Sequence, residues 1–162
     1  MTIPVEQLQS LNGFTIIELF ELKLIENIHY DPNHITTQVL YRFHNGTNEI
    51  NTEIRWDGNI YTPIACNAEG FETSSNTTMA RPTLTFANVG GTITTILEIV
   101  NSFHSFNDLQ RAEVTRIRTL AQFLDDANFT DNNNPYGTAD PTKELEKQEF
   151  LIVHKVPNIV SR

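Results

Sequence analysis

The sequence predicts a mainly β protein with one or two short helices, whose antiparallel sheets form a barrel or a sandwich. Apolar and polar residues alternate over residues 14–24 and again after Pro82, and the dipeptides Asn45-Gly46 and Asp57-Gly58 lie between apolar runs. Alternation with a period of two is typical of a strand that buries one face. Asn-Gly and Asp-Gly tolerate the positive φ of two-residue hairpin turns, which indicates antiparallel strands.

The N-terminal part of the chain is expected to be an arm followed by a strand. Residues 1–13 form the arm, in which residues 5–11 fit a short helix after Pro4. The half-buried strand over residues 14–24 points Phe20, Leu22 and Leu24 to one side. Residues 14–162 form the β-rich region, with the option of two interleaved small β-domains divided near residue 110.

Two hairpins are predicted in the next segment. Residues 41–44 are expected to fold back at Asn45-Gly46 onto the segment that begins near Thr47. Residues 54–56 and 59–61 flank Asp57-Gly58 in the same way. A polar loop over residues 73–79 follows, and Pro82 begins the next strand, over residues 82–86.

One helix and two further strands complete the prediction. Apolar residues recur at helical spacing over residues 93–103, with Thr92 as the expected N-cap. Residues 114–123 are expected to form a strand that carries Arg116 and Arg118 on one side. A long polar loop spans residues 125–141 and is expected to be solvated or ordered by a neighbouring subunit. A last strand begins at Phe150.

Composition narrows the function classes. The 162 residues carry a formal net charge of −9, the opposite of what phosphate binding requires, so a sequence-specific nucleic-acid binder is not expected. No export signal or membrane-spanning segment is expected either, and we anticipate assembly in a cytoplasm. The single cysteine, Cys66, offers neither an internal disulfide nor a multi-cysteine metal site.

Candidate chemical sites each have a simpler interpretation. His29, Asp31 and His34 are possible metal ligands, but their spacing fits no template and solvated loop residues are favoured. The acidic and amide residues of 125–134 fail the calcium-loop template. Cys66 is favoured as a small buried hydrophobe over a nucleophile. The concentration of positive charge at Arg111, Arg116 and Arg118 is favoured as a sheet face with local counter-ions over a contact with an acidic subunit or DNA.

Several short motifs follow one another along the chain. Their residues are Trp56, Gly58, Tyr61, Pro63, Gly70, Phe71, Glu72, Arg81, Pro82, Leu84, Phe123, Leu124, Asp125, Asn128, Phe129, Asp140 and Pro141. The order of these motifs, over roughly residues 14–155, resembles the minor tail protein L family of lambda-like siphophages.

The resemblance implies a structural component of the virion's tail tip, with β-rich domains related to tail-tube modules and no enzymatic activity. Implied partners are further copies of the chain, as a trimer or a hexamer, a distal tail ring, and a central hub or fibre protein. Arg116, Arg118 and Tyr136 are candidate subunit contacts. An iron-sulfur cluster is expected only if a cysteine-rich C-terminal segment is missing from this chain.

Three alternatives remain open. One is another tail module, such as a distal-tail or tail-completion protein, which would share the fold and the charge. A second is a carbohydrate-binding β-sandwich, in which Trp56 and Tyr61 would form an exposed stacking platform. The third is an enzyme that uses Cys66 or a metal. Burial of both rings would exclude the second.

Overall fold

The structure is a computed structural model that describes residues 13–34, 38–46, 52–71, 81–87, 91–104 and 107–153. Its elements in chain order are strands β1 (Ile16–Lys23), β2 (Leu40–His44), β3 (Ile54–Trp56), β4 (Asn59–Pro63), β5 (Cys66–Glu69) and β6 (Thr83–Phe86), helix α2 (Thr92–Phe103), strand β7 (Glu113–Leu120), the 3-10 turns η2 (Ala121–Phe123), η3 (Asp126–Asn128) and η4 (Thr130–Asn132), and strand β8 (Glu146–Leu151). The predicted mainly β fold is confirmed. The expected helix over residues 5–11 and the loop over residues 73–79 lie outside the described residues.

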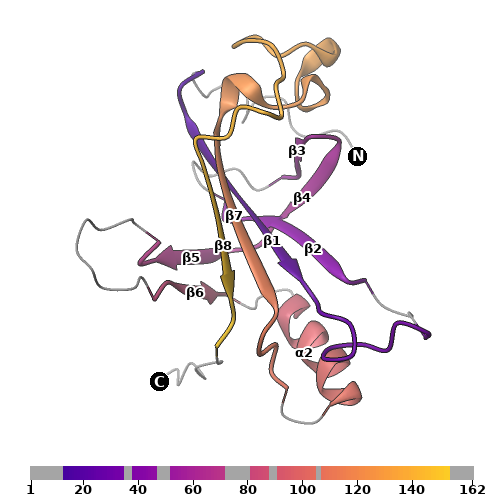
Figure 1. The fold of residues 1–162 in the computed structure, drawn as a ribbon. Helices are drawn as coiled ribbons and strands as arrows, with labels where there is room; N and C mark the ends of the chain where they lie inside the picture. The colour runs from indigo at the N-terminus through magenta and orange to yellow at the C-terminus, as the bar shows by residue number, and fades with distance from the viewer. Residues whose placement is uncertain are drawn as a thin grey trace.

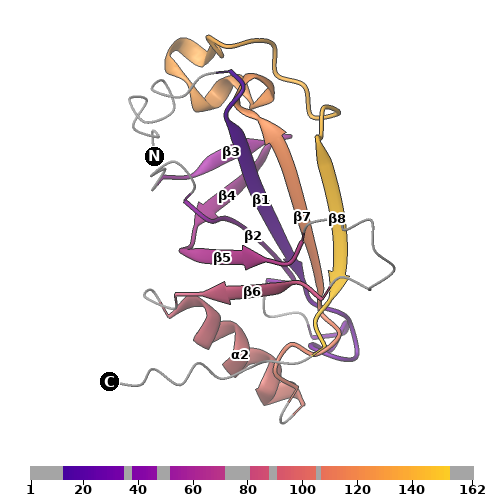
Figure 2. The ribbon, with the colours of Figure 1, turned by 90° about the vertical axis from the view of Figure 1, so that its left-hand side faces the viewer.

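Six strands form one curled sheet in the order β3-β4-β2-β1-β7-β8, and β5 pairs with β6 in a second, two-stranded sheet. Figures 1 and 2 show that β5 and β6 cross the long strands at a steep angle, with α2 beyond them. All pairs are antiparallel except β2 with β4, which run parallel. The six-stranded sheet is therefore a half-barrel whose end strands, among the described residues, are β3 and β8.

The two predicted turns behave differently. β3 and β4 form the expected hairpin, and Asp57 and Gly58 have φ values of 51° and 70°, as a type I′ turn requires. After Asn45-Gly46 the continuation falls on residues 47–51, outside the described part of the chain. The described neighbours of β2 are β1 and β4 instead, so β4 lies where the simple hairpin would have placed the segment near Thr47.

Several boundaries differ from prediction, and three of the differences have a clear physical cause. Gly91, with φ 71°, is the N-cap of α2, and Thr92 is its first helical residue, because left-handed backbone is easiest for glycine. β7 ends at Leu120, and residues 121–123 turn in 3-10 geometry as the chain leaves the sheet. β8 begins at Glu146, four residues before the predicted Phe150, in a stretch whose polar residues hid the strand.

The buried apolar residues form two clusters. We call the first the hairpin core: Ile17, Leu19, Ile54, Trp56, Tyr61, Ile117, Ala121, Leu124 and Phe129. We call the second the helix core: Phe20, Leu22, Leu24, Phe43, Ile96, Val100, Leu109, Ala112 and Val114. Both draw on β1 and β7, the central strands of the long sheet.

β1 supplies both cores because its alternate side chains point to opposite faces. Ile17 and Leu19 enter the hairpin core, while Phe20 and Leu22 enter the helix core, and all four are at most 3% exposed. Phe20, Leu22 and Leu24 share a side, as predicted. The expectation that the strand is only half-buried is wrong, since apolar residues occupy both alternations and each finds a core.

Candidate functional site

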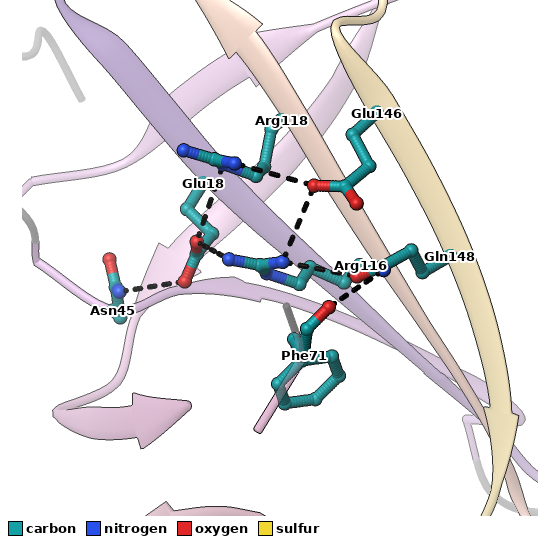
Figure 3. A network of polar contacts seen from close by, with 7 residues as sticks. All are labelled: Glu18, Asn45, Phe71, Arg116, Arg118, Glu146 and Gln148. Carbon is teal, nitrogen blue, oxygen red and sulfur yellow. Dashed lines mark hydrogen bonds and ion pairs between the residues drawn. The ribbon is translucent and has the colours of Figure 1, made fainter. Parts of the chain in front are cut away.

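One face of the long sheet carries a compact network of charged side chains. Register places Glu18 of β1 opposite Arg118 of β7, and Arg118 opposite Glu146 of β8. Arg116 lies two residues along β7, opposite Gln148. Because residues two apart on a strand share a face, all five side chains converge, as Figure 3 shows. The prediction that both arginines share one side is confirmed.

Arg116 is at the centre of this network. Its Nη2 lies 2.6 Å from Oε2 of Glu18, and its Nη1 lies 3.6 Å from Oε2 of Glu146 and donates to Gln148 Oε1 at 3.0 Å. The side chain of Arg116 is only 10% exposed and that of Glu18 15%, so these charges are paired largely out of water. Removing one member would leave the others buried without compensation.

Arg118 joins the network from the more exposed side. Its Nη1 donates to Glu146 Oε2 at 3.3 Å, and its Nε lies 3.9 Å from Glu18 Oε2. Arg111 lies before β7, is exposed and donates its backbone N–H to Ile152. Local counter-ions therefore surround two of the three arginines, which supports the simpler interpretation of this positive charge.

Two of the family-like motifs meet beneath the network. The guanidinium carbon of Arg116 lies 5.0 Å from the centre of the Phe71 ring, and Phe71 accepts a hydrogen bond from Gln148 Nε2 through its carbonyl. Gly70 has φ 75°, and a Cβ there would lie 3.4 Å from the backbone of Arg81 and Pro82. Glycine thus lets the two motifs approach and seats Phe71 under Arg116. Glu72 lies outside the described residues.

Two polar side chains from the segment after β7 hydrogen-bond the β3–β4 hairpin, and we call this pair the brace. Asp125 accepts the backbone N–H groups of Asp57 and Gly58, at 2.9 and 2.8 Å, one on each carboxylate oxygen. Asn128 accepts the N–H of Arg55 and donates to its carbonyl, both at 2.6 Å. The Asn128 side chain thus bonds the outer backbone groups of β3, as a neighbouring strand would. Asp125 and Asn128 lie about 70 positions along the chain from the residues that they bond.

The segment after η2 is packed against its own chain rather than solvated. Asn134 is 5% exposed and donates to the carbonyls of Ala121 and Leu124. Phe129 is buried in the hairpin core, and its ring meets that of Tyr136 edge to face, with 5.9 Å between ring centres. The expectation that this loop is solvated or needs a neighbouring subunit for order is wrong at these positions.

The remaining motif residues lie in three places. Asp140 donates its backbone N–H to Phe123, and its carboxylate accepts the N–H and the hydroxyl of Thr142, which lowers the pKa of Asp140. Pro141 lies between these two residues in the turn. Pro63 ends β4 opposite His44, and Leu84 packs on the helix core from β6.

The histidine cluster does not assemble. His29 is fully buried, with Nδ1 accepting the N–H of Ile25 and Nε2 bonded to the carbonyl of Gln110, and burial lowers the pKa of its ring. His34 is exposed and pairs with Asp31 at 2.8 Å. Within the described residues no group of three or more His, Cys, Asp or Glu side chains is placed to hold a metal ion.

Cys66 and the two large aromatic residues are also accounted for by packing. Cys66 is half-buried in β5 against the helix core, and burial raises the pKa of its thiol to about 12, so it is protonated at neutral pH. Trp56 is 2% exposed and Tyr61 1% exposed. The carbohydrate-stacking platform therefore does not exist.

No described helix is long and apolar enough to cross a membrane.

Comparison with known proteins identifies the family of this chain. The family model described as Phage minor tail protein L matches residues 34–158, more than half of the chain. The chain belongs to this family. The Tail tip protein L of Escherichia phage lambda is 37% identical over 105 residues, which cover 65% of this chain and 41% of the lambda protein. The chain thus spans about two fifths of the length of that relative. As a member of the family it is a structural component of the phage tail.

The sequence analysis singled out some of the residues in these contacts but missed their partners. It identified Asp125, Asn128, Gly70 and Phe71 as family-like residues and paired the two arginines on one face. It missed Glu18, Glu146 and Gln148, because only strand register brings them to the arginines. Glu146, Gln148 and Phe150 alternate with more exposed residues along β8. Their side chains are a carboxylate, an amide and a phenyl ring, so the face has no uniform apolar pattern by which the sequence would have revealed the strand.

Proposed function

We propose that the chain is one subunit of a ring at the tail tip, which joins the tail tube or distal tail ring to the central hub or fibre protein. The observation that carries this proposal is membership of the minor tail protein L family across residues 34–158. The same membership favours the tail tip over a distal-tail or tail-completion role. By analogy within the family, three copies are favoured and six are the alternative.

The open half-barrel supports assembly with neighbours. Strands at the end of a sheet present unpaired backbone groups that proteins cover or blunt. β3 and β8 end the six-stranded sheet in the described part of the chain, and Asn128 already bonds the outer backbone groups of Arg55 in β3, so β8 is the edge that a neighbour would cover. Identical copies that meet head to tail cover such surfaces when their rotation closes a ring. Arg116, Arg118 and Tyr136 stay candidates for subunit contacts, with Arg118 the more accessible arginine at 33% side-chain exposure.

The acidic surplus suits a conduit for DNA. A net charge of −9 on each subunit would be multiplied in a ring. A lumen lined with carboxylates repels phosphates, so DNA slides through it rather than binding. This part of the proposal needs no sequence-specific contact with nucleic acid and no membrane insertion. We propose no cofactor for this chain, since its one cysteine cannot hold an iron-sulfur cluster.

Reconstruction of the intact virion tail by electron cryo-microscopy tests the proposal. We expect density that fits the half-barrel at the tip, in three copies around the tail axis, between the distal tail ring and the central fibre, with most carboxylates toward the axis. A single copy, or a position at the neck or in the capsid, would overturn the ring. Carboxylates on the outer surface would overturn the conduit alone.

A further inference from the structure

The outer edge of β8 offers backbone groups for pairing. β8 is last in the sheet order, so within the described ranges no strand pairs with its outer side. The N–H of Ile152 donates to Ala112, which sets the alternation along the strand. In an antiparallel pair, successive residues direct their backbone groups to opposite sides. Glu146, Gln148 and Phe150 therefore face β7, and Lys147, Glu149 and Leu151 direct their N–H and C=O groups outward.

The same alternate residues are exposed through their side chains. Leu151 is 61% exposed, and Lys147 and Glu149 are exposed as well. Leu145, just before β8, is 53% exposed, but its N–H donates to the carbonyl of Arg118 in β7. An edge strand that ends in an exposed leucine is a hazard for uncontrolled pairing unless another chain covers it. The lysine and the glutamate reduce that hazard for most partners, because a partner must match both charges.

This edge is complementary to itself. Residues 145–151 read Leu-Glu-Lys-Gln-Glu-Phe-Leu, with Gln148 at the centre. When two copies of β8 lie antiparallel with Gln148 opposite Gln148, Lys147 of each copy lies opposite Glu149 of the other. Opposite charges at directly opposed positions stabilise an antiparallel ladder.

Neighbouring registers lack this match. Only registers that place outward-facing residues opposite one another form ladder hydrogen bonds. The adjacent permitted registers place Lys147 opposite Lys147, or Glu149 opposite Glu149. Like charges at opposed positions destabilise the pair. The sequence of β8 therefore selects one register, about a two-fold axis through Gln148.

We propose that the free chain pairs with a second copy of itself through the outer edges of β8, in this register. The pairing goes beyond the ring, since it joins two copies about a two-fold axis and covers the edge before assembly into the tail. One strand pair buries far less than the roughly 1,600 Å² of a standard interface, so we expect a dissociation constant of about micromolar order. Neighbours in the tail can then displace the second copy.

Charge reversal of the 162-residue chain tests this pairing by sedimentation equilibrium. The unaltered chain should be a dimer at high micromolar concentration. Lys147→Glu and Glu149→Lys should each raise the dissociation constant at least tenfold, because each sets two like-charged pairs across the two-fold axis. An equimolar mixture of the two variants should form dimers again, since both edge glutamates of the first variant then lie opposite edge lysines of the second.

Lys143→Glu is the matched control, because it reverses an exposed lysine outside β8 and should leave the dimer unchanged. A monomeric unaltered chain, unimpaired dimers of either single variant, or a mixture that stays monomeric would each overturn the proposal. Far-ultraviolet circular dichroism checks that every variant keeps its fold. None of these outcomes bears on the ring, which is tested in the virion.

Discussion

The hairpin core and the helix core lie on opposite faces of one sheet, yet they are held by different interactions. In the hairpin core, side chains of Asp125 and Asn128 hydrogen-bond the backbone of β3 and of its turn. In the helix core, aromatic rings pack on one another, with Phe20 and Phe43 stacked at 5.5 Å and Phe43 and Phe86 edge to face at 5.2 Å. Both cores bury apolar side chains, and the hairpin core adds side-chain hydrogen bonds to the backbone of a β-hairpin.

This difference decides which residues each core can exchange. A hydrogen bond to backbone needs one amide or carboxylate at one place, whereas an apolar cluster tolerates swaps that conserve volume. The motif residues that carried the family resemblance accordingly gather at the hairpin core and its brace: Trp56, Gly58, Tyr61, Leu124, Asp125, Asn128 and Phe129. The helix core contributes few of them.

The largest expected effect tests whether the two cores unfold together. Phe20→Ala should lower the free energy of unfolding by about 3 to 5 kcal/mol, since it removes a fully buried ring from the helix core. The only tryptophan, Trp56, lies in the hairpin core, so its fluorescence reports on the core that was left unchanged. Because β1 belongs to both cores, urea unfolding followed by fluorescence and by circular dichroism should shift together. A fluorescence midpoint that stays in place would show independent cores.

A smaller effect is expected from the brace. Asn128→Leu should cost about 2 to 4 kcal/mol, because it keeps the volume but deprives the N–H and C=O of Arg55 of their partner. Asn59→Ala is the control, since within the described residues the Asn59 side chain bonds the nearby carbonyl of Asp57 and no distant group, and its cost should stay within about 0.5 kcal/mol. Equal losses in urea unfolding would show that the brace does not hold the hairpin.

The smallest effect is the pH dependence of stability that two buried histidines, His44 and His29, are expected to cause. His44 accepts the N–H of Gly46 and bonds the carbonyl of Thr52, and burial lowers the pKa of its ring, as it does for His29 beside the helix core. The unfolded chain then binds protons more readily than the folded one. The free energy of unfolding should be highest above about pH 6.5 and fall as the pH drops below it.

Thermal unfolding between about pH 5 and pH 8, the range in which histidine titrates, measures this dependence. His44→Gln should reduce the loss of thermal stability at low pH, relative to His34→Gln, which alters an exposed histidine. Identical pH profiles for the two variants would show that His44 does not carry the effect.

The elements that the sequence predicted best are those set by local chemistry. The Asp57-Gly58 hairpin, the strand over β1 and the helix over α2 follow from turn residues and periodicity, which need no knowledge of neighbours. The mainly β fold and the family follow from the same short stretches. The predicted N-cap of α2 was wrong, because the N-cap is Gly91, which has no side chain, and Thr92 is the first helical residue.

The features that escaped prediction depend on partners distant in sequence. The parallel pairing of β2 with β4, the second buried face of β1 and the charged network on Glu18 all require strand order and register. The buried amides of Asn128 and Asn134 looked like loop residues because composition alone does not distinguish an asparagine in water from one bonded to buried backbone. Only the fold reveals which of the two it is.

The double role of β1 constrains how such a chain can change in length. Ile17 and Leu19 face one core and Phe20 and Leu22 the other. Inserting or deleting a single residue within the strand would turn each group toward the wrong side. Length variation among related tail proteins should therefore collect between strands, in stretches such as residues 125–141, while the residue count of β1 stays fixed.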